Sequence, residues 1–254
     1  MDLLQYFIVC PLVFLAGFID AIAGGGGLIS LPAYLIAGLP PHFAIGTNKM
    51  SSTLGTVVAT AKYALNGYIH WRHVLVCVPA ALIGASLGSN LALLVPDDVF
   101  LVILIVLLPL IALYVLRRKS LTSDLPPHSR LKESLLLIGI SLVIGMYDGF
   151  YGPGTGTFLM LVLTGVAHVS LHDAAGITKA VNLTSNVVAL SVFLWNGVVW
   201  IQLGLVAALF SIFGNYLGAR YFTKDGARIV RPVILFVLSI FFIKIIYDLV
   251  QAYV

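Results

Sequence analysis

The chain has 254 residues, of which 60% are hydrophobic and only 9% are charged. Because soluble domains carry roughly a quarter charged residues, this composition excludes an aqueous surface and predicts an integral membrane protein that contacts the lipid bilayer. The net charge of +4 lies mostly in predicted loops, where membrane topology explains it, so no nucleic-acid partner is expected.

Apolar segments long enough to cross about 30 Å of hydrocarbon follow one another along the chain. Their hydrophobic pattern is continuous rather than alternating, which favours helices over a barrel of short strands. We therefore predict an all-α polytopic membrane protein. The long segments cover about 4–22, 43–65, 74–94, 98–116, 133–151, 174–195, 199–221 and 232–250, and two shorter ones, 28–39 and 155–167, are more typical of half-helices or re-entrant pieces.

Glycine-rich stretches interrupt the chain directly before the two short segments. The first runs from Gly17 to Gly27 and contains four consecutive glycines, which a helix rarely continues through. The second runs from Gly145 to Gly156 and repeats three glycines and one aspartate of the first at an offset of 128 positions. Two broken hydrophobic helices in corresponding places are a strong sequence indicator of a transporter binding site.

The similarity between the two halves continues beyond these breaks, at an offset of 130 positions. Lys49 matches Lys179, and the Asn-Gly pair at Asn66 matches the pair at Asn196. Apolar composition alone would not supply ordered matches of Gly, Lys and Asn-Gly. We therefore interpret the two halves as copies of one repeat.

The chain is predicted to consist of a first membrane repeat at 1–118, a linker at 119–132 and a second membrane repeat at 133–254. The linker lies in the most basic connection of the chain and should be cytoplasmic by the positive-inside rule. Counting segments from it places both termini outside, so the second repeat begins on the side opposite to the first. Such inverted-topology repeats are the geometry of an alternating-access carrier with its site near the membrane midplane.

Candidate substrate-binding residues lie at the two breaks and along the segment after each half-helix. Free N–H groups at the start of a short helix favour an anion, although glycines there also permit close helix packing. A lysine about six residues into an apolar segment needs a partner or a cavity, or else snorkels to the interface. The polar residues around it either line a substrate path or join helices. The candidates are Gly25, Gly26, Gly27, Leu28, Thr47, Asn48, Lys49, Gly154, Thr155, Gly156, Thr178, Lys179 and Asn182.

Asp20 and Asp148 lie one helical turn before the breaks. They brace freed backbone groups, pair with a lysine or carry a proton, and the sequence leaves these roles open. Cys10 and Cys77 lie in apolar segments without metal-ligand spacing, and no catalytic motif appears. We expect no cofactor, no metal site and no enzymatic activity.

The glycine-rich patterns at 17–27 and 148–156 and the lysine-containing patterns at 44–49 and 175–179 are typical of one family of proteins. Through these patterns the sequence resembles the sulfite exporter TauE/SafE family over nearly its whole length. The resemblance implies a multi-pass carrier of the bacterial cytoplasmic (inner) membrane that exports, or in some members imports, small sulfur-containing anions such as sulfite, sulfoacetate or other organosulfonates. The second copy reads Ile177-Thr178 where the first reads Thr47-Asn48, so the two lysine sites need not contribute equally.

Three classes of function stay open at this point. The first is a secondary carrier of a small anionic substrate, with H⁺ or Na⁺ as the coupling ion and a homo-oligomer as one candidate assembly. The second is a membrane-embedded enzyme or assembly factor that acts on a lipid or a cofactor. The third is a cation carrier or channel that uses Asp20 and Asp148.

Overall fold

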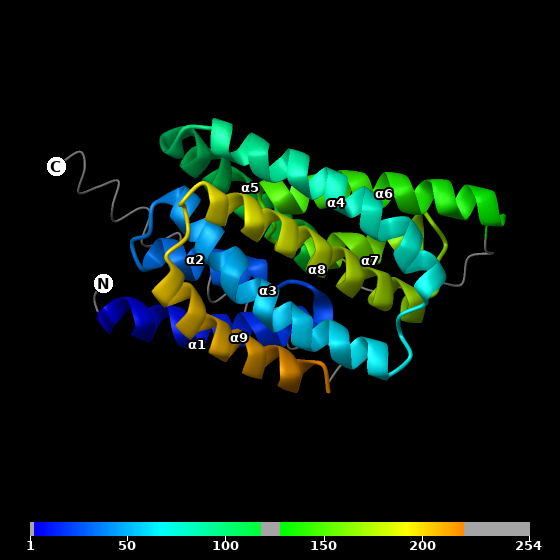
Figure 1. Cartoon of the computed structure of the whole chain (residues 1–254), viewed down its shortest axis with the longest axis horizontal. Helices are drawn as coiled ribbons and strands as arrows, with labels where there is room; N and C mark the ends of the chain where they lie inside the picture. Colours follow the sequence, from blue (N-terminus) through cyan, green and yellow to red (C-terminus); the bar gives the residue numbers. More distant parts are fainter. Residues whose placement is uncertain (1–2, 118–127, 221–254) are drawn as a thin grey trace.

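The computed structural model describes residues 3–117 and 128–220, and in these ranges the chain forms nine helices and no strands (Figure 1). The prediction of an all-α protein is therefore confirmed. Most of the predicted linker and the whole of the predicted last segment, 232–250, lie outside the described residues. The helices are α1 (Leu3–Ala23), α2 (Gly27–Ile36), α3 (Pro41–Leu65), α4 (Trp71–Leu94), α5 (Asp97–Arg117), α6 (Arg130–Phe150), α7 (Thr155–Gly165), α8 (Leu171–Trp195) and α9 (Ile201–Gly218).

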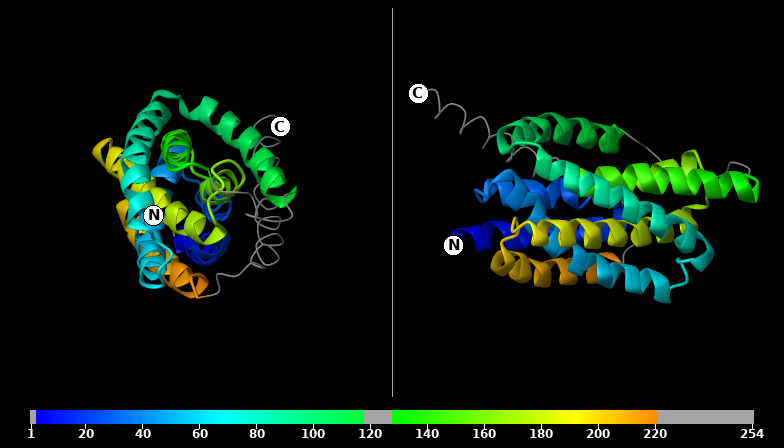
Figure 2. Two further views of the ribbon diagram at one scale, coloured as in Figure 1. Left: turned by 90° about the vertical axis from the view of Figure 1, so that its right-hand side faces the viewer. Right: turned by 45° about the horizontal axis from the view of Figure 1, so that its top comes forward.

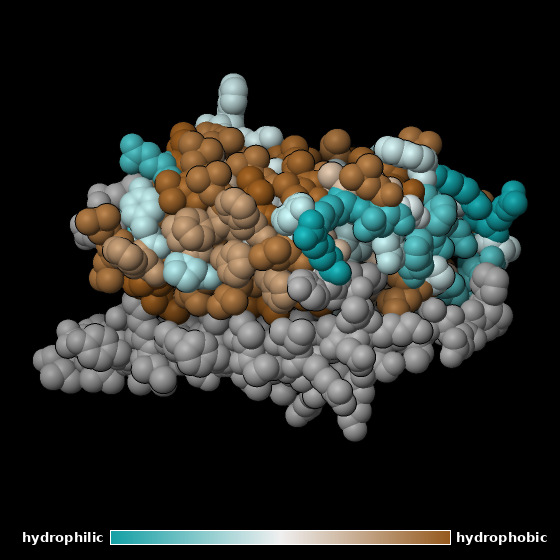
Figure 3. Space-filling model, turned by 90° about the horizontal axis from the view of Figure 1, so that it is seen from below, coloured by the Kyte–Doolittle hydropathy of each residue, from teal (hydrophilic) through white to brown (hydrophobic). Residues whose placement is uncertain are grey.

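The long helices form a bundle whose members run roughly along one axis (Figure 2). Helices α1, α4, α6, α8 and α9 are long and apolar enough to cross a membrane. The face shown in Figure 3 is covered mostly by hydrophobic side chains, while hydrophilic side chains gather toward the end where α6 begins. An apolar lateral surface of this kind is what a lipid-embedded bundle requires.

Helix α3 is long enough to span the membrane but differs in composition from its neighbours. Its 25 residues extend roughly 37 Å at 1.5 Å per residue. Polar side chains along it are buried against other helices rather than turned to the lipid, because an unpaired polar group in hydrocarbon is costly. The buried polar residues of α3 are Thr47, Asn48, Lys49, Ser51, Thr53 and Thr56.

The two short helices, α2 and α7, follow the predicted glycine breaks. They have only 10 and 11 residues, and most of their side chains are buried. Both breaks contain left-handed glycines, a conformation that other residues adopt only with strain. The first break has Gly24 with φ +72°, and the second has Gly152 with φ +97° and Gly154 with φ +81°. The chain thus reverses inside the bundle, so that α1–α2 and α6–α7 form two helical hairpins.

The packing of each half has a counterpart in the other half. Helix α1 packs on α9 as α6 packs on α4, and α3 packs on α9 as α8 packs on α4. A Cβ atom at Gly84 would collide with the carbonyl of Leu142, and one at Gly214 would collide with the carbonyl of Phe14. These two glycines are 130 positions apart in the sequence, so equivalent residues make equivalent close helix contacts.

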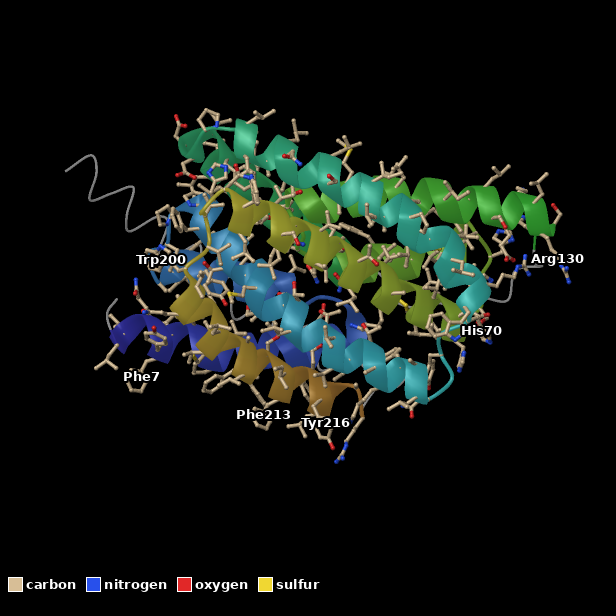
Figure 4. All side chains as sticks on the ribbon, viewed as in Figure 1. Phe7, His70, Arg130, Trp200, Phe213 and Tyr216 are labelled. Carbon is tan, nitrogen blue, oxygen red and sulfur yellow. The ribbon has the colours of Figure 1, made fainter. Side chains whose placement is uncertain are left out.

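The Asn-Gly turns after α3 and α8 also have the same geometry. Asn66 has φ −86° and ψ 5°, and Asn196 has φ −88° and ψ 4°. The two turns lie at opposite ends of the bundle, because the first leads to His70 and the second to Trp200 (Figure 4). Helices α3 and α8 therefore run in opposite directions.

Candidate functional site

The backbones of the two glycine breaks touch each other inside the bundle. The carbonyl of Gly24 accepts a hydrogen bond from the N–H of Thr157 at 3.3 Å. A Cβ atom placed on Gly24 would lie 2.5 Å from the Cα atom of Gly156. This close approach requires glycine on both sides and brings the starts of the two half-helices together.

Lys49 of α3 forms a deeply buried ion pair with Asp148 of α6. Its Nζ atom lies 3.0 Å from Asp148 Oδ1, and each side chain is only 2% exposed. Lys49 also donates a hydrogen bond of 2.8 Å to Asn186 Oδ1. Asp148 accepts further hydrogen bonds from Ser185 and, at 2.9 Å, from the hydroxyl of Thr155, the first residue of α7. The carboxylate thus pairs with a lysine and also braces the break.

Lys179 of α8 forms the second ion pair, with Asp20 of α1. Its Nζ atom lies 3.1 Å from Asp20 Oδ2 and donates to the backbone carbonyl of Asp20 at 2.7 Å. The lysine is 3% exposed, whereas the aspartate is 16% exposed. Asp20 is therefore the more accessible member of this ion pair.

The two pairs are reciprocal between the halves of the chain. Lys49 and Asp20 come from the first half, and each pairs with the opposite charge from the second half, on Asp148 and Lys179 respectively. Neither lysine snorkels toward a membrane surface. A buried ammonium group without a partner would be strongly destabilising, so the pairing accounts for the depth of both lysines.

A small cavity lies between the two breaks. Its volume is about 40 Å³, enough for a few water molecules, so a larger anion fits only after the lining has moved apart. The described conformation is therefore closed around its charged groups. Of the residues predicted from the sequence, those that line the cavity are Asp20, Gly26, Gly27, Asn48, Lys49, Asp148, Thr155, Gly156 and Asn182.

The other predicted residues lie outside the cavity lining. The hydroxyl of Thr47 accepts a hydrogen bond from the N–H of Trp200 at 3.0 Å and so joins two segments. Thr178 has a buried hydroxyl with no hydrogen-bond partner among the described residues. Lys179 does not line the cavity, but it contacts Asp20, which does. Gly25, Leu28 and Gly154 belong to the breaks and to the adjoining helix start.

The backbone N–H groups predicted to bind an anion are largely occupied in this conformation. Leu28 N–H donates to the carbonyl of Gly25 at 3.1 Å, and Thr157 N–H donates across to the other break. Thr155 N–H donates to Gly152 at 3.2 Å. The ammonium groups of Lys49 and Lys179 are paired as well, with Asp148 and Asp20, so an anion reaches either kind of donor only after these contacts open.

Ser211 and Asn215 of α9 line the cavity but do not stand out in the sequence. They are one helical turn apart in an apolar helix. The side chain of Asn215 packs closely on α3, because a Cβ atom on Gly55 would lie 2.5 Å from Asn215 Nδ2. Their spacing was the available signal, because two polar residues at i and i+4 mark one polar face. Asn186 also lines the cavity, and its contact with Lys49 spans 137 positions.

Comparison with known proteins gives the same family along most of the chain. The family model described as sulfite exporter TauE/SafE matches residues 9–245. A "Probable membrane transporter protein" of Sinorhizobium sp is 40% identical over 235 residues, which cover 92% of this chain and 90% of that protein.

Two further relatives carry the same description. The protein of Haemophilus influenzae is 34% identical and covers 92% of each chain. The protein YfcA of Escherichia coli (strain K12) is 32% identical over 92% of this chain and 87% of its own length. No solved structure matches. The chain is therefore a multi-pass membrane protein that belongs to the sulfite exporter TauE/SafE family, a family of transporters rather than enzymes.

Proposed function

We propose that this transporter is a secondary carrier that exports a small sulfur-containing anion, such as sulfite, sulfoacetate or another organosulfonate, across the cytoplasmic membrane. The observation that carries the proposal is the pair of buried lysines, Lys49 and Lys179, on either side of the meeting point of the two breaks. Each lysine places a positive charge where a bare charge would be costly, so its partner must be an anion. The family description names sulfite as the substrate class of this family.

The substrate is bound by exchange of anionic partners at the lysines. In the closed conformation Asp148 and Asp20 occupy the positions that an oxyanion would take beside Lys49 and Lys179. An entering anion replaces one carboxylate, and that carboxylate must then be neutralised because a buried unpaired charge is unfavourable. A proton or a Na⁺ ion taken up by the aspartate meets this need, which links anion movement to a coupling ion.

The two halves act as inverted repeats with the site between them. The reciprocal ion pairs, the matching glycine contacts and the opposite directions of α3 and α8 support this arrangement. Alternating access then consists of a movement of one half against the other around the meeting point of the breaks. Both termini lie on the external side.

Transport of a cation by Asp20 and Asp148 is less well supported by the geometry. Each carboxylate already contacts an ammonium group, at 3.1 Å and 3.0 Å. A metal cation or Na⁺ would have to displace a lysine and leave that lysine unpaired. The lysines make the cavity more suitable for an anion than for a cation.

Transport into proteoliposomes tests the proposal. Sulfite, sulfoacetate, taurine, thiosulfate and simple carboxylates are offered to the purified protein, with and without a pH gradient. We expect saturable transport of one or more sulfur oxyanions, and stimulation by the gradient would identify H⁺ as the coupling ion. Transport of Na⁺ or a metal cation without any of these anions would contradict the proposal.

A further inference from the structure

A cluster of metal-ligating side chains lies far from the cavity, at the end of the bundle where α4 and α8 begin. Ligand atoms of His70, His73 and Asp173 all lie within 4.8 Å of one another. Figure 4 places His70 at the same end of the bundle as Arg130. Two imidazoles and a carboxylate at this separation form a donor set that suits a divalent transition-metal ion.

The starts of α4 and α8 position these three side chains. His70 is the residue before the first turn of α4, and His73 follows three positions later. Asp173 lies in the first turn of α8, where the positive end of the helix dipole favours a carboxylate. Its Oδ2 atom accepts a hydrogen bond of 2.8 Å from Ser170, while its Oδ1 atom lies 2.5 Å from His70 Nδ1.

The ring of His73 has hydrogen-bonding capacity that the protein does not use. Its Nδ1 atom is buried and has no hydrogen-bond partner among the described residues. Its Nε2 atom lies 3.3 Å from Glu133 Oε1 at the start of α6. With Nδ1 as the metal ligand, Nε2–H donates to Glu133. A carboxylate behind a ligating histidine is the usual arrangement in metal sites, because it fixes the tautomer and the ring orientation.

A second histidine–aspartate pair lies at the other end of the bundle, and its histidine has no unused ring nitrogen. His42 Nδ1 lies 2.5 Å from Asp97 Oδ1, and its Nε2 atom lies 2.9 Å from the carbonyl of Ala92. Both ring nitrogens are therefore occupied by protein groups. His42 thus provides a matched control for a pair without metal-binding geometry.

We propose that His70, His73 and Asp173 form a binding site for a divalent transition-metal ion such as Zn²⁺, with Glu133 behind His73. The His70 side chain is 57% exposed, so an ion reaches the site from solution and a water molecule completes its coordination. Binding through His70 Nδ1 separates this atom from Asp173 Oδ1 to about 3.3 Å, the spacing of two ligands on tetrahedral zinc. The ion ties α4 in the first half to α8 in the second, and the proposal does not depend on the identity of the transported anion.

Metal titration of the purified, tag-free protein tests this site. After removal of bound metal, Zn²⁺ is added in a calorimeter, and Co²⁺ is added in parallel while its visible absorption is recorded. We expect one saturable equivalent of Zn²⁺ and Co²⁺ bands of low coordination number. The double variant His70→Ala/His73→Ala should lose this equivalent, and Glu133→Gln should weaken it about ten- to a hundredfold. The control His42→Ala should bind as the unmodified protein does.

Two results would overturn the proposal. One is the absence of saturable Zn²⁺ binding and of low-coordination Co²⁺ bands in the unmodified protein. The other is an unchanged stoichiometry and affinity in the double variant. The Co²⁺ spectrum of the unmodified protein needs no variant, so the test stands even where a substitution prevents folding.

Discussion

Lys49 is a long charged side chain with almost no access to solvent, and its surroundings show why it is stable there. Asp148 and Asn186 contact its ammonium group at 3.0 and 2.8 Å. Removing one member of a buried ion pair typically costs about 3–5 kcal/mol, because the other charge is left without a partner. A single substitution therefore mixes an effect on folding with any effect on anion binding.

The double variant Lys49→Ala/Asp148→Asn separates these two effects. Lys49→Ala alone should lower stability by about 3–5 kcal/mol, whereas the double variant should recover most of that loss because no buried charge remains unpaired. If Lys49 binds the substrate, the double variant should still bind the anion about ten- to a hundredfold more weakly, in keeping with the loss of one charge-assisted hydrogen bond. Thermal unfolding and an anion titration are measured on both proteins. Wild-type affinity in the double variant would remove Lys49 from the binding site.

The two aspartates should differ in their contribution to stability. Asp148 is 2% exposed and accepts hydrogen bonds from Ser185 and Thr155 in addition to its lysine, whereas Asp20 is 16% exposed. Asp148→Asn should therefore lower the apparent melting temperature more than Asp20→Asn, since it disturbs more buried hydrogen bonds. Thermal unfolding of the two variants in the same detergent gives the comparison. An equal or larger loss for Asp20→Asn would contradict this ranking.

At the scale of the helical elements, the breaks depend on direct backbone contact. A Cβ atom on Gly156 would lie 2.5 Å from the Cα atom of Gly24, and backbone cannot move away as a flexible side chain can. The breaks therefore have a steric requirement in addition to their left-handed φ angles. This contact belongs to the closed conformation in which both ion pairs are formed.

Gly156→Ala should push the two breaks apart. We expect a loss of about 1–3 kcal/mol, as for overpacking of an interior, together with reduced transport. Gly139→Ala is the matched control, because a Cβ atom there meets nothing within 4 Å and alanine favours a helix interior. Apparent melting temperatures and transport rates are compared for the two variants. Equal behaviour of Gly156→Ala and Gly139→Ala would show that the contact between the breaks is not required.

The sequence predicts the positions of the helices far better than it predicts which charged residues pair with each other. Consecutive glycines and the recurrence of Asp20 as Asp148 are local signals, and the half-helices follow them as expected. The choice of partner for each aspartate is not local. Asp20 pairs with Lys179, 159 positions away, rather than with Lys49, which is much nearer in the chain. That choice depends on how the two halves dock, and no residue pattern within one half encodes it.

At the scale of the whole molecule, the Asn-Gly turns allow a direct test of orientation. Asn66 and Asn196 occupy turns of the same geometry at opposite ends of the bundle. The native cysteines Cys10 and Cys77 are buried and are replaced by alanine for this test. In intact cells, a membrane-impermeant maleimide should label Asn196→Cys at once and Asn66→Cys only after permeabilisation. The reverse labelling pattern would show that the linker faces outward and that the termini are internal.

The reciprocal ion pairs also have a consequence for biosynthesis. When the first half leaves the ribosome, it carries Lys49 and Asp20 into the membrane while both of their partners are still unmade. The last of the four charges, on Lys179, is synthesised after about two thirds of the chain. Burial of all four charges must therefore follow the insertion of α8. Until then the nascent first half is an incomplete folding intermediate, whose charges stay hydrated or in contact with the insertion machinery.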